Sequence, residues 1–186
     1  DLAARGLVTR QEALELRRHA ALLAQIRIRL HLLAGRREDR ILFDYQSALA
    51  ESFRIGATGA KRPSELFMQR YYRAAKAVTQ LNTILLQNLG AAIFPASAAA
   101  PAPLNARFQM VRELLDARDP LVFEREPHAI LESFLLLQQH PELKGMTAPT
   151  LRALWRARTR IDGRFRRDPE NRARFLALLQ QPRGIV

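Results

Sequence analysis

The four histidines are the side chains of this sequence best suited to metal chemistry, but their neighbours do not fit a metal-dependent hydrolase. A phosphohydrolase of the His-Asp type needs an adjacent His-Asp pair, whereas these histidines precede Ala, Leu, Ala and Pro: His19, His31, His128 and His140. Transfer of a nucleotide needs two close carboxylates that hold Mg²⁺ against a triphosphate, usually Asp-x-Asp after a Gly-Ser loop. Neither that pattern nor a phosphate-binding glycine loop, His-Glu-x-x-His or Gly-x-Ser-x-Gly occurs. We therefore expect no metal ligand and no independent catalysis in this chain.

The densest group of charges is the run Gly35-Arg-Arg-Glu-Asp-Arg40. Opposite charges this close together favour ion pairs within the run, which would hold a loop in one conformation. The alternative is that Arg36, Arg37 and Arg40 contact a nucleotide or a protein substrate. Both interpretations stay open at the level of sequence.

A second basic and aromatic group consists of Arg70, Tyr72 and Lys76. Tyr72 and Lys76 lie one helical turn apart and share a face that is distinct from the apolar stripe of their helix. Such a pair is typical of an exposed amphipathic surface. The functional alternative is again a contact with a nucleotide or a protein substrate.

Two further arginines fall among apolar side chains when the sequence is drawn on a helical wheel. Arg27 lies within the apolar arc of the first expected helix, and Arg158 lies between Trp155 and Ile161. An unpaired buried charge is strongly destabilising. We therefore expect Arg27 and Arg158, together with Asp39, to form structural ion pairs or to contact a neighbouring domain.

The net charge of +12 and the isoelectric point near 11.4 raise the possibility of nucleic-acid binding. Arginine supplies 27 of the 30 basic residues, a bias that a GC-rich coding sequence also produces. The charge is concentrated toward one end, because residues 150–186 hold ten Arg against three acids (10 − 3 = +7), whereas 104–149 hold five basic and seven acidic residues (5 − 7 = −2). The aromatic residues of the basic end, Trp155, Phe165 and Phe175, all lie on apolar stripes, so no base-stacking surface is evident.

The absence of cysteine excludes disulfides, thiol catalysis and thiolate metal sites, and it favours a cytoplasmic location. No apolar stretch approaches the roughly 20 residues that a membrane span needs. The first residues include neither a starting Met nor the basic-then-apolar order of a signal peptide. We expect a segment of a longer protein, with no contact with a membrane.

Helical signals dominate the chain. Thr9-Arg-Gln-Glu12 is a capping box that starts a helix, and Gly35 is suited to end it. A second helix is expected at about 44–53. Pro63 starts a third, whose apolar stripe runs for about 25 residues in steps of three and four. Further helix starts are expected at Asp119-Pro120, Pro127, Thr147 and Asp168-Pro169, and the helix that starts at Thr147 carries apolar residues as far as Phe165.

These signals predict an all-α fold, a bundle of about seven helices that forms one connecting domain over residues 1–186. Its subregions 1–94 and 104–186 are joined by the Ala/Pro-rich linker 95–103, which has too little apolar pattern to pack. Residues 107–119 are compatible with strand or helix. No convincing sheet is expected.

Several runs of the sequence resemble one family, the PII uridylyltransferases. In the first half they are the runs 31–40, 42–46 and Phe-Met-Gln-Arg-Tyr-Tyr-Arg (67–73) with Lys76, which are similar to the segment after the family's nucleotidyltransferase domain. In the second half they include Arg118-Asp-Pro120 and Leu-Leu-Leu-Gln-Gln-His-Pro-Glu-Leu-Lys-Gly (135–145), which are similar to the stretch before its HD phosphohydrolase domain. The family usually has a glycine-containing hairpin near 107–119, and the lack of glycine there makes a hairpin doubtful in this chain.

The resemblance implies a sensor of nitrogen status. The whole enzyme would transfer UMP from UTP to a tyrosine of the PII signalling protein, with Mg²⁺, and would hydrolyse it off at a separate HD site. The implied partners of this segment are therefore the flanking nucleotidyltransferase and HD domains and PII, and the segment itself would hold no cofactor. Helical domains that follow a nucleotidyltransferase fold generally form one wall of the substrate cleft. The alternatives are a basic helical module that binds nucleic acid and a free-standing bundle that binds a partner.

Overall fold

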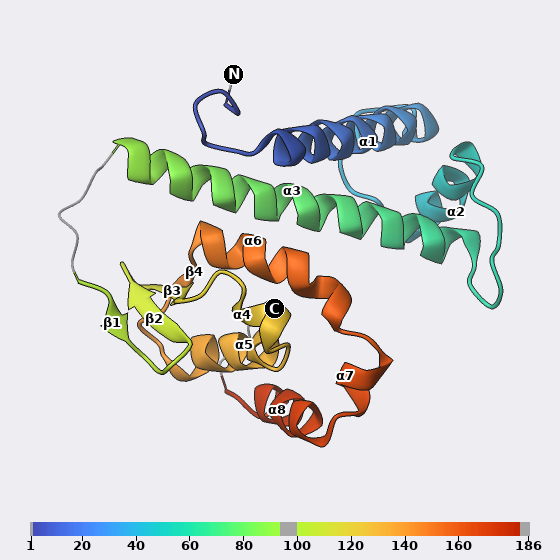
Figure 1. The fold of residues 1–186 in the computed structure, drawn as a ribbon. Coiled ribbons are helices and arrows are strands. Elements are labelled where there is room, and N and C mark those ends of the chain that lie inside the picture. The colour runs from blue at the N-terminus through green and yellow to red at the C-terminus, as the bar shows by residue number, and fades with distance from the viewer. Residues whose placement is uncertain (1, 94–99, 183–186) are drawn as a thin grey trace. The chain divides into compact units, whose positions relative to one another are not determined.

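The first helix begins and ends where the sequence predicts. The Thr9 hydroxyl accepts the Glu12 backbone N–H at 3.1 Å, and the Glu12 carboxylate accepts the Thr9 backbone N–H at 2.8 Å, so both halves of the capping box are present. Helix α1 (Arg10–Ala34) then runs to Gly35, whose φ of 63° is the left-handed conformation that glycine adopts without strain. This start and this end are confirmed (Figure 1).

Two more helices complete the first half of the chain. Helix α2 (Phe43–Ser52) agrees with the expected 44–53 to within one residue, and helix α3 (Pro63–Ile93) begins at the predicted proline. The stripe of α3 that the sequence predicts contributes Phe67, Ala74 and Leu81 to the buried side chains.

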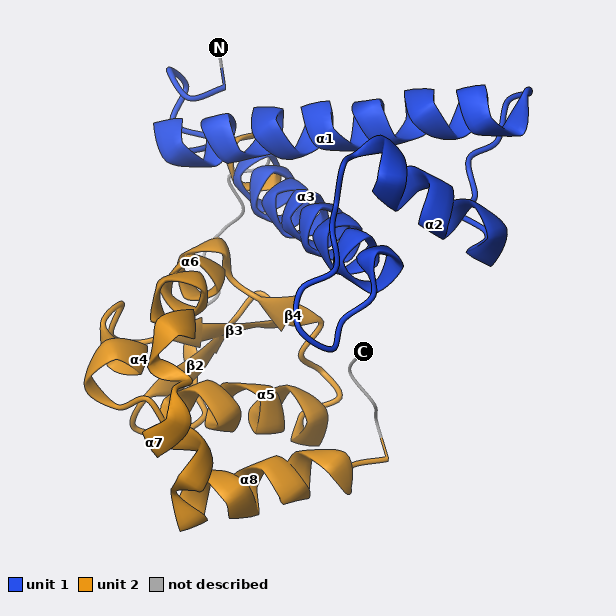
Figure 2. Ribbon diagram, turned by 90° about the vertical axis from the view of Figure 1, so that its right-hand side faces the viewer, with its two compact units in different colours: residues 1–89 blue, residues 90–186 orange. Residues whose placement is uncertain are grey.

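The computed structural model describes residues 2–93 and 100–182, and it divides the chain into two compact units, residues 1–89 and 90–186 (Figure 2). Residues 95–99 of the expected linker lie outside the described residues. The core of the first unit joins α1, α2 and α3 through five buried side chains: Ile26, Leu30, Leu49, Ala50 and Phe67.

The second unit contains a small sheet, so the all-α prediction is wrong in this part of the chain. Its strands are β1 (Ala102–Pro103), β2 (Phe108–Val111), β3 (Leu114–Ala117) and β4 (Gly145–Met146), in that order across the sheet. The first three pair antiparallel, and β4 pairs parallel with β3. Strands this short carry too few residues for a period of two to stand out from the sequence.

The hairpin that the missing glycine made doubtful is present between β2 and β3. Val111 pairs with Leu114, so the turn holds only Arg112 and Glu113. Both turn residues have positive φ, 51° and 61°, as the tight two-residue turns of hairpins require. Left-handed conformations are unfavourable for such residues. The ladder and its buried side chains, Phe108 and Leu115, hold the turn closed nevertheless.

Five helices and a 3₁₀ turn are described around this sheet. The helices are α4 (Val122–Arg125), α5 (Ala129–Gln139), α6 (Ala148–Ala157), α7 (Gly163–Arg167) and α8 (Pro169–Leu179). The Thr147 and Asp168 side chains cap α6 and α8 as predicted. The prediction of one helix from Thr147 to Phe165 is wrong, because α6 ends at Ala157, a 3₁₀ turn (Arg158–Arg160) follows, and Asp162 caps the separate α7.

The core of the second unit lies between the sheet and these helices, and its largest fully buried side chains include Phe108, Phe123 and Leu115. Helix α8 contributes little to it, because its predicted apolar stripe leaves Phe175, Leu176 and Leu179 exposed. Among the described residues, no helix combines the length and the apolar character of a membrane span.

Candidate functional site: an arginine-lined groove between α1 and α3

The arginines of the loop after α1 form ion pairs with a carboxylate of the same loop. Glu38 is only 5% exposed, and its carboxylate accepts the Arg40 backbone N–H at 3.0 Å and Arg36 Nη2 at 2.9 Å. That backbone hydrogen bond, together with the charges of Arg36 and Arg40, lowers the pKa of Glu38. The two arginines are themselves largely exposed, so Glu38 fixes the loop while their guanidinium groups stay on the surface.

Asp39 ties the same loop back to α1. Its carboxylate accepts Arg27 Nε at 2.7 Å and lies 3.5 Å from both His31 Nε2 and Arg37 Nε. The hydrogen bond from Arg27 is the main cause of the lowered pKa of Asp39. The structure thus brings Arg27, Arg37 and Asp39 together in an ion-pair network, at the surface and not among buried apolar side chains.

A groove of about 700 Å³ between α1 and α3 has a different character. Its apolar lining includes Leu22 and Leu66, and its basic lining consists of Arg18 and His19 from α1 and Arg70 and Arg73 from α3. Among the described residues, no carboxylate lines it. The groove lies entirely within the first unit.

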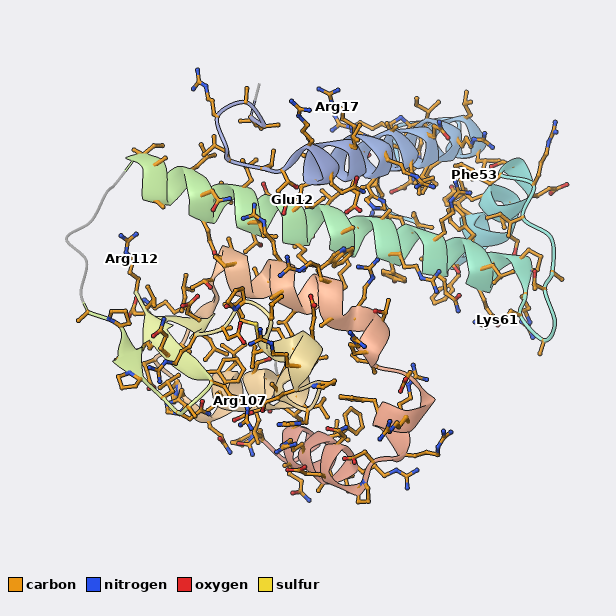
Figure 3. All side chains as sticks on the ribbon, viewed as in Figure 1. Glu12, Arg17, Phe53, Lys61, Arg107 and Arg112 are labelled. Atoms are coloured by element: carbon orange, nitrogen blue, oxygen red, sulfur yellow. The ribbon has the colours of Figure 1, made fainter. Side chains whose placement is uncertain are left out.

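The three arginines of the groove have no carboxylate partner among the described residues. The acidic residues of the same helices are engaged elsewhere: Glu15 accepts the Gln11 side-chain amide, and Glu65 accepts the Arg62 backbone N–H. Arg70 lies 5.7 Å from the centre of the Phe53 ring, a cation–π contact that leaves its N–H groups available. Phe53 stands at the end of α2 (Figure 3).

Such a groove is suited to an anion. Guanidinium groups donate paired hydrogen bonds to carboxylate and phosphate. Like charges on both walls of a groove add their fields, although solvent screens them because all three arginines are exposed. The groove therefore has the chemistry to bind a phosphate-bearing or carboxylate-bearing ligand.

The other residues that the sequence singled out lie apart from this lining. Tyr72 is 64% exposed and packs edge-on against Tyr71, and Lys76 is exposed on the same helix. Arg158 lies in the 3₁₀ turn of the second unit, where its guanidinium stacks over the Trp155 ring at 4.7 Å and donates to the Trp155 carbonyl. No ion pair to a described carboxylate involves Arg158.

Sequence reasoning missed Arg18 and Arg73. Arg70 and Arg73 are three residues apart, which places them on one helix face, and this spacing was the available signal. The approach of Arg18 from α1 depends on tertiary packing and had no signal in the sequence.

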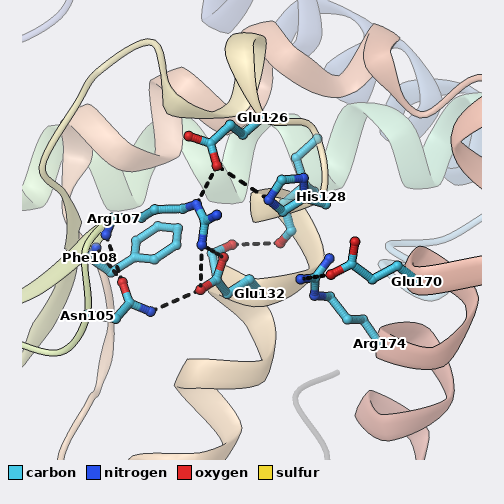
Figure 4. Close-up of polar contacts among 10 residues, drawn as sticks. Asn105, Arg107, Phe108, Glu126, His128, Glu132, Glu170 and Arg174 are labelled. Atoms are coloured by element: carbon cyan, nitrogen blue, oxygen red, sulfur yellow. Dashed lines mark hydrogen bonds and ion pairs between the residues drawn. The ribbon is translucent and has the colours of Figure 1, made fainter.

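A second charged cluster, in the second unit, was also missed (Figure 4). Arg107 Nε donates to Glu126 at 2.6 Å, and its Nη1 donates to Glu132 at 3.2 Å. The pKa of Arg107 is raised by Glu126, and that of Glu126 is lowered by Arg107. Asn105 donates to Glu132 and accepts the backbone N–H groups of Arg107 and Phe108, so the cluster fixes the start of β2 against α5. One guanidinium bridges two carboxylates within the same unit, an arrangement that suits a structural role.

Among residues 2–93 and 100–182, no group of three His, Asp or Glu side chains could hold a metal ion.

Comparisons with known proteins agree with the resemblance seen in the sequence. A family model described as GlnD PII-uridylyltransferase matches residues 1–86, and one described as uridylyltransferase GlnD third domain matches 108–186. Proteins named bifunctional uridylyltransferase/uridylyl-removing enzyme are similar over the whole chain: the one from Aromatoleum aromaticum is 61% identical, and those from Nitrosospira multiformis and Ralstonia nicotianae are 52% identical. The chain spans 22%, 21% and 22% of the lengths of these relatives. No solved structure matches it.

Proposed function

The chain belongs to the GlnD uridylyltransferase family, and from that membership we propose that it is a non-catalytic segment of a bifunctional uridylyltransferase/uridylyl-removing enzyme. The enzyme would transfer UMP from UTP to the PII protein and remove it again, and the segment would serve nitrogen regulation by holding the catalytic domains in place. The observation that supports this role is the match of both family models, in order, along a chain whose described residues hold no metal-ligating cluster.

The active part of the proposal is that the first unit forms one wall of a substrate cleft. Arg18, Arg70 and Arg73 have no carboxylate partner within residues 2–93 and 100–182 and line one groove, which fits the triphosphate of UTP or an acidic surface of PII. The other candidate contacts are Tyr72 and Lys76, which are exposed on α3, and Arg36, Arg37 and Arg40, which the loop carboxylates hold at the surface. Mg²⁺ and the reacting groups belong, in this proposal, to the flanking domains.

Equilibrium binding of UTP and of PII to the full-length enzyme tests the groove. Each exposed charge-assisted contact is worth about 1 kcal/mol, roughly a five-fold change in affinity. We expect Arg70→Gln and Arg73→Gln each to lower the affinity of the enzyme for one of the two ligands by about five-fold. Arg17→Gln is the matched control. Arg17 is an exposed arginine on α1 (Figure 3), and it is not among the residues that line the groove. If both ligands bind the groove variants as tightly as the control, the groove is not the contact surface.

The surface residues outside the groove need a separate comparison. Arg37→Ala and Lys76→Ala, in the full-length enzyme, should raise the apparent KM for UTP or PII. If the affinities and turnover of both variants stay unchanged, these two residues do not belong to the cleft. Specific RNA or DNA binding that survives physiological salt would instead favour the nucleic-acid alternative.

A further inference from the structure

The second unit has an apolar pocket that the proposed function does not use. A cavity of about 640 Å³ opens between α5, α7 and α8, and its apolar lining is Leu131, Ile161, Phe165, Phe175 and Leu176. Three polar residues complete the lining: Arg166, Asn171 and Arg172. A cavity of this size and composition is typical of a binding site.

The pocket continues into an exposed apolar face of α8. Phe175 is 52% exposed, Leu176 58% and Leu179 68%. These residues follow Arg172 with the spacing i, i+3, i+4 and i+7, so they share one face of the helix. Arg174, Ala177 and Leu178, on the other side of the helix, are half-buried against the unit. A soluble surface rarely leaves such a face open without a partner.

The polar side chains of the pocket are only partly paired with other described residues. Arg166 forms no ion pair with a described residue, and Arg172 donates only its Nε, to the Arg166 carbonyl at 3.0 Å. Asn171 is 7% exposed, and although its Nδ2 donates to the Phe165 carbonyl, its Oδ1 has no hydrogen-bond partner among the described residues. A buried acceptor without a donor is destabilising. The pocket is therefore incomplete in both charge and hydrogen bonding.

We infer that the α5/α7/α8 pocket and the exposed face of α8 are the docking site of an amphipathic helix from the longer enzyme, outside residues 1–186, which carries an acidic residue beside its apolar stripe. The apolar face of such a helix would cover Phe175, Leu176 and Leu179, in the manner of helix-in-groove recognition. Its carboxylate would pair with Arg166 and Arg172. The relatives are long enough to supply it, since this chain spans only about a fifth of their length.

The inference rests on the proposal that the chain is one segment of a longer enzyme, but not on the arginine groove. Its test involves no substrate, so the two can fail separately. The segment has no cysteine of its own, which makes introduced thiols easy to follow by peptide mass spectrometry.

The test is the maleimide labelling rate of Leu176→Cys and Leu179→Cys in the native full-length enzyme. The matched control is Ala173→Cys, which is exposed on the same helix and does not line the pocket. We expect labelling at least about ten-fold slower at 176 and 179 than at 173, and equal rates in urea. Equal native rates at all three sites would overturn the inference. Protection that disappears on dilution would also overturn it and identify a second copy of the enzyme as the occupant.

A charge-reversal variant tests whether the docked helix is acidic. Arg172→Glu, combined with Leu176→Cys, should increase labelling at 176 several-fold, because the reversed charge repels an acidic partner. Arg160→Glu is the control, since Arg160 is an exposed arginine outside this pocket. Unchanged labelling with Arg172→Glu would contradict an acidic occupant.

Discussion

In the turn between β2 and β3, a glycine variant should be more stable than an alanine variant, the reverse of the usual order. Arg112, which is labelled in Figure 3, lies in the turn. Its φ of 51° is unfavourable by about 1–2 kcal/mol for a residue with a Cβ. Glycine adopts it without that strain but loses more chain entropy on folding, by about 0.5–1 kcal/mol. The net expectation is that Arg112→Gly is more stable than Arg112→Ala by about 1 kcal/mol. Because both variants remove the whole arginine side chain beyond Cβ, their difference isolates the backbone conformation.

Urea unfolding of the 186-residue chain, followed by tryptophan fluorescence, measures this difference. Trp155 is the single tryptophan and lies on α6 of the same unit as the hairpin, so its signal reports the relevant transition. The free energies of unfolding of the two variants can be compared directly if both show the same dependence on urea concentration. An alanine variant that is as stable as the glycine variant would refute the two-residue turn with positive φ.

Three further expectations follow from individual contacts. Thr150→Val should destabilise the second unit by about 1–3 kcal/mol, because the buried Thr150 hydroxyl accepts the Ala117 backbone N–H at 2.8 Å and its loss leaves that donor unpaired; unchanged hydrogen exchange of the Ala117 amide would argue against it. At the helix ends, Arg54→Gly should stabilise the first unit by about 1 kcal/mol and Gly35→Ala should destabilise it by a similar amount, since both positions have positive φ. Shifts of the thermal unfolding midpoint in the same direction for the two variants would contradict this. Glu126→Gln should lower the midpoint of urea unfolding at pH 7, but not at acidic pH. The folded pKa of Glu126 lies below its ordinary 4.5, so its stabilising effect is present above that value and is lost as the pH falls through the folded pKa; a deficit that persists at low pH, or one equal to that of Glu51→Gln at an exposed site on α2, would contradict the pairing with Arg107.

Helix starts and ends were predictable because their signals are local. The Thr9 capping box, Gly35, Pro63 and the caps at Thr147 and Asp168 each satisfy backbone groups within a few residues, and the structure has helix ends at all of them. The sheet was not predictable in the same way. Its strands have two to four residues, and β4 meets β3 only because the chain returns from α5.

The hairpin was misjudged for a physical reason that is specific to its turn. Glycine is the usual residue at positive φ, and its absence from 107–119 argued against a tight turn. The strand pairing of Phe108 with Ala117, and the burial of Phe108 and Leu115, outweigh the local strain at Arg112 and Glu113. Tertiary burial of this kind is not visible in the sequence of the turn.

For the candidate site, the sequence identified residue types but not their grouping. Arg36, Arg37 and Arg40 were distinguished by density, and the structure gives them carboxylate neighbours in the same loop. Arg70 was also identified, but Arg18, its neighbour in the groove, comes from a helix more than fifty residues earlier in the chain. Only the packing of α1 against α3 reveals that these arginines share one groove.

The most direct test of the account is the steady-state kinetics of the full-length enzyme with Arg18, Arg70 and Arg73 all changed to Gln. If the segment binds substrate but does not react with it, three lost contacts of about 1 kcal/mol each should raise the KM of one transferase substrate by about 100-fold, with kcat within about three-fold of the unmodified enzyme. The opposite pattern, a kcat that falls by about 100-fold while both KM values stay unchanged, would contradict the claim that the chemistry lies outside this segment.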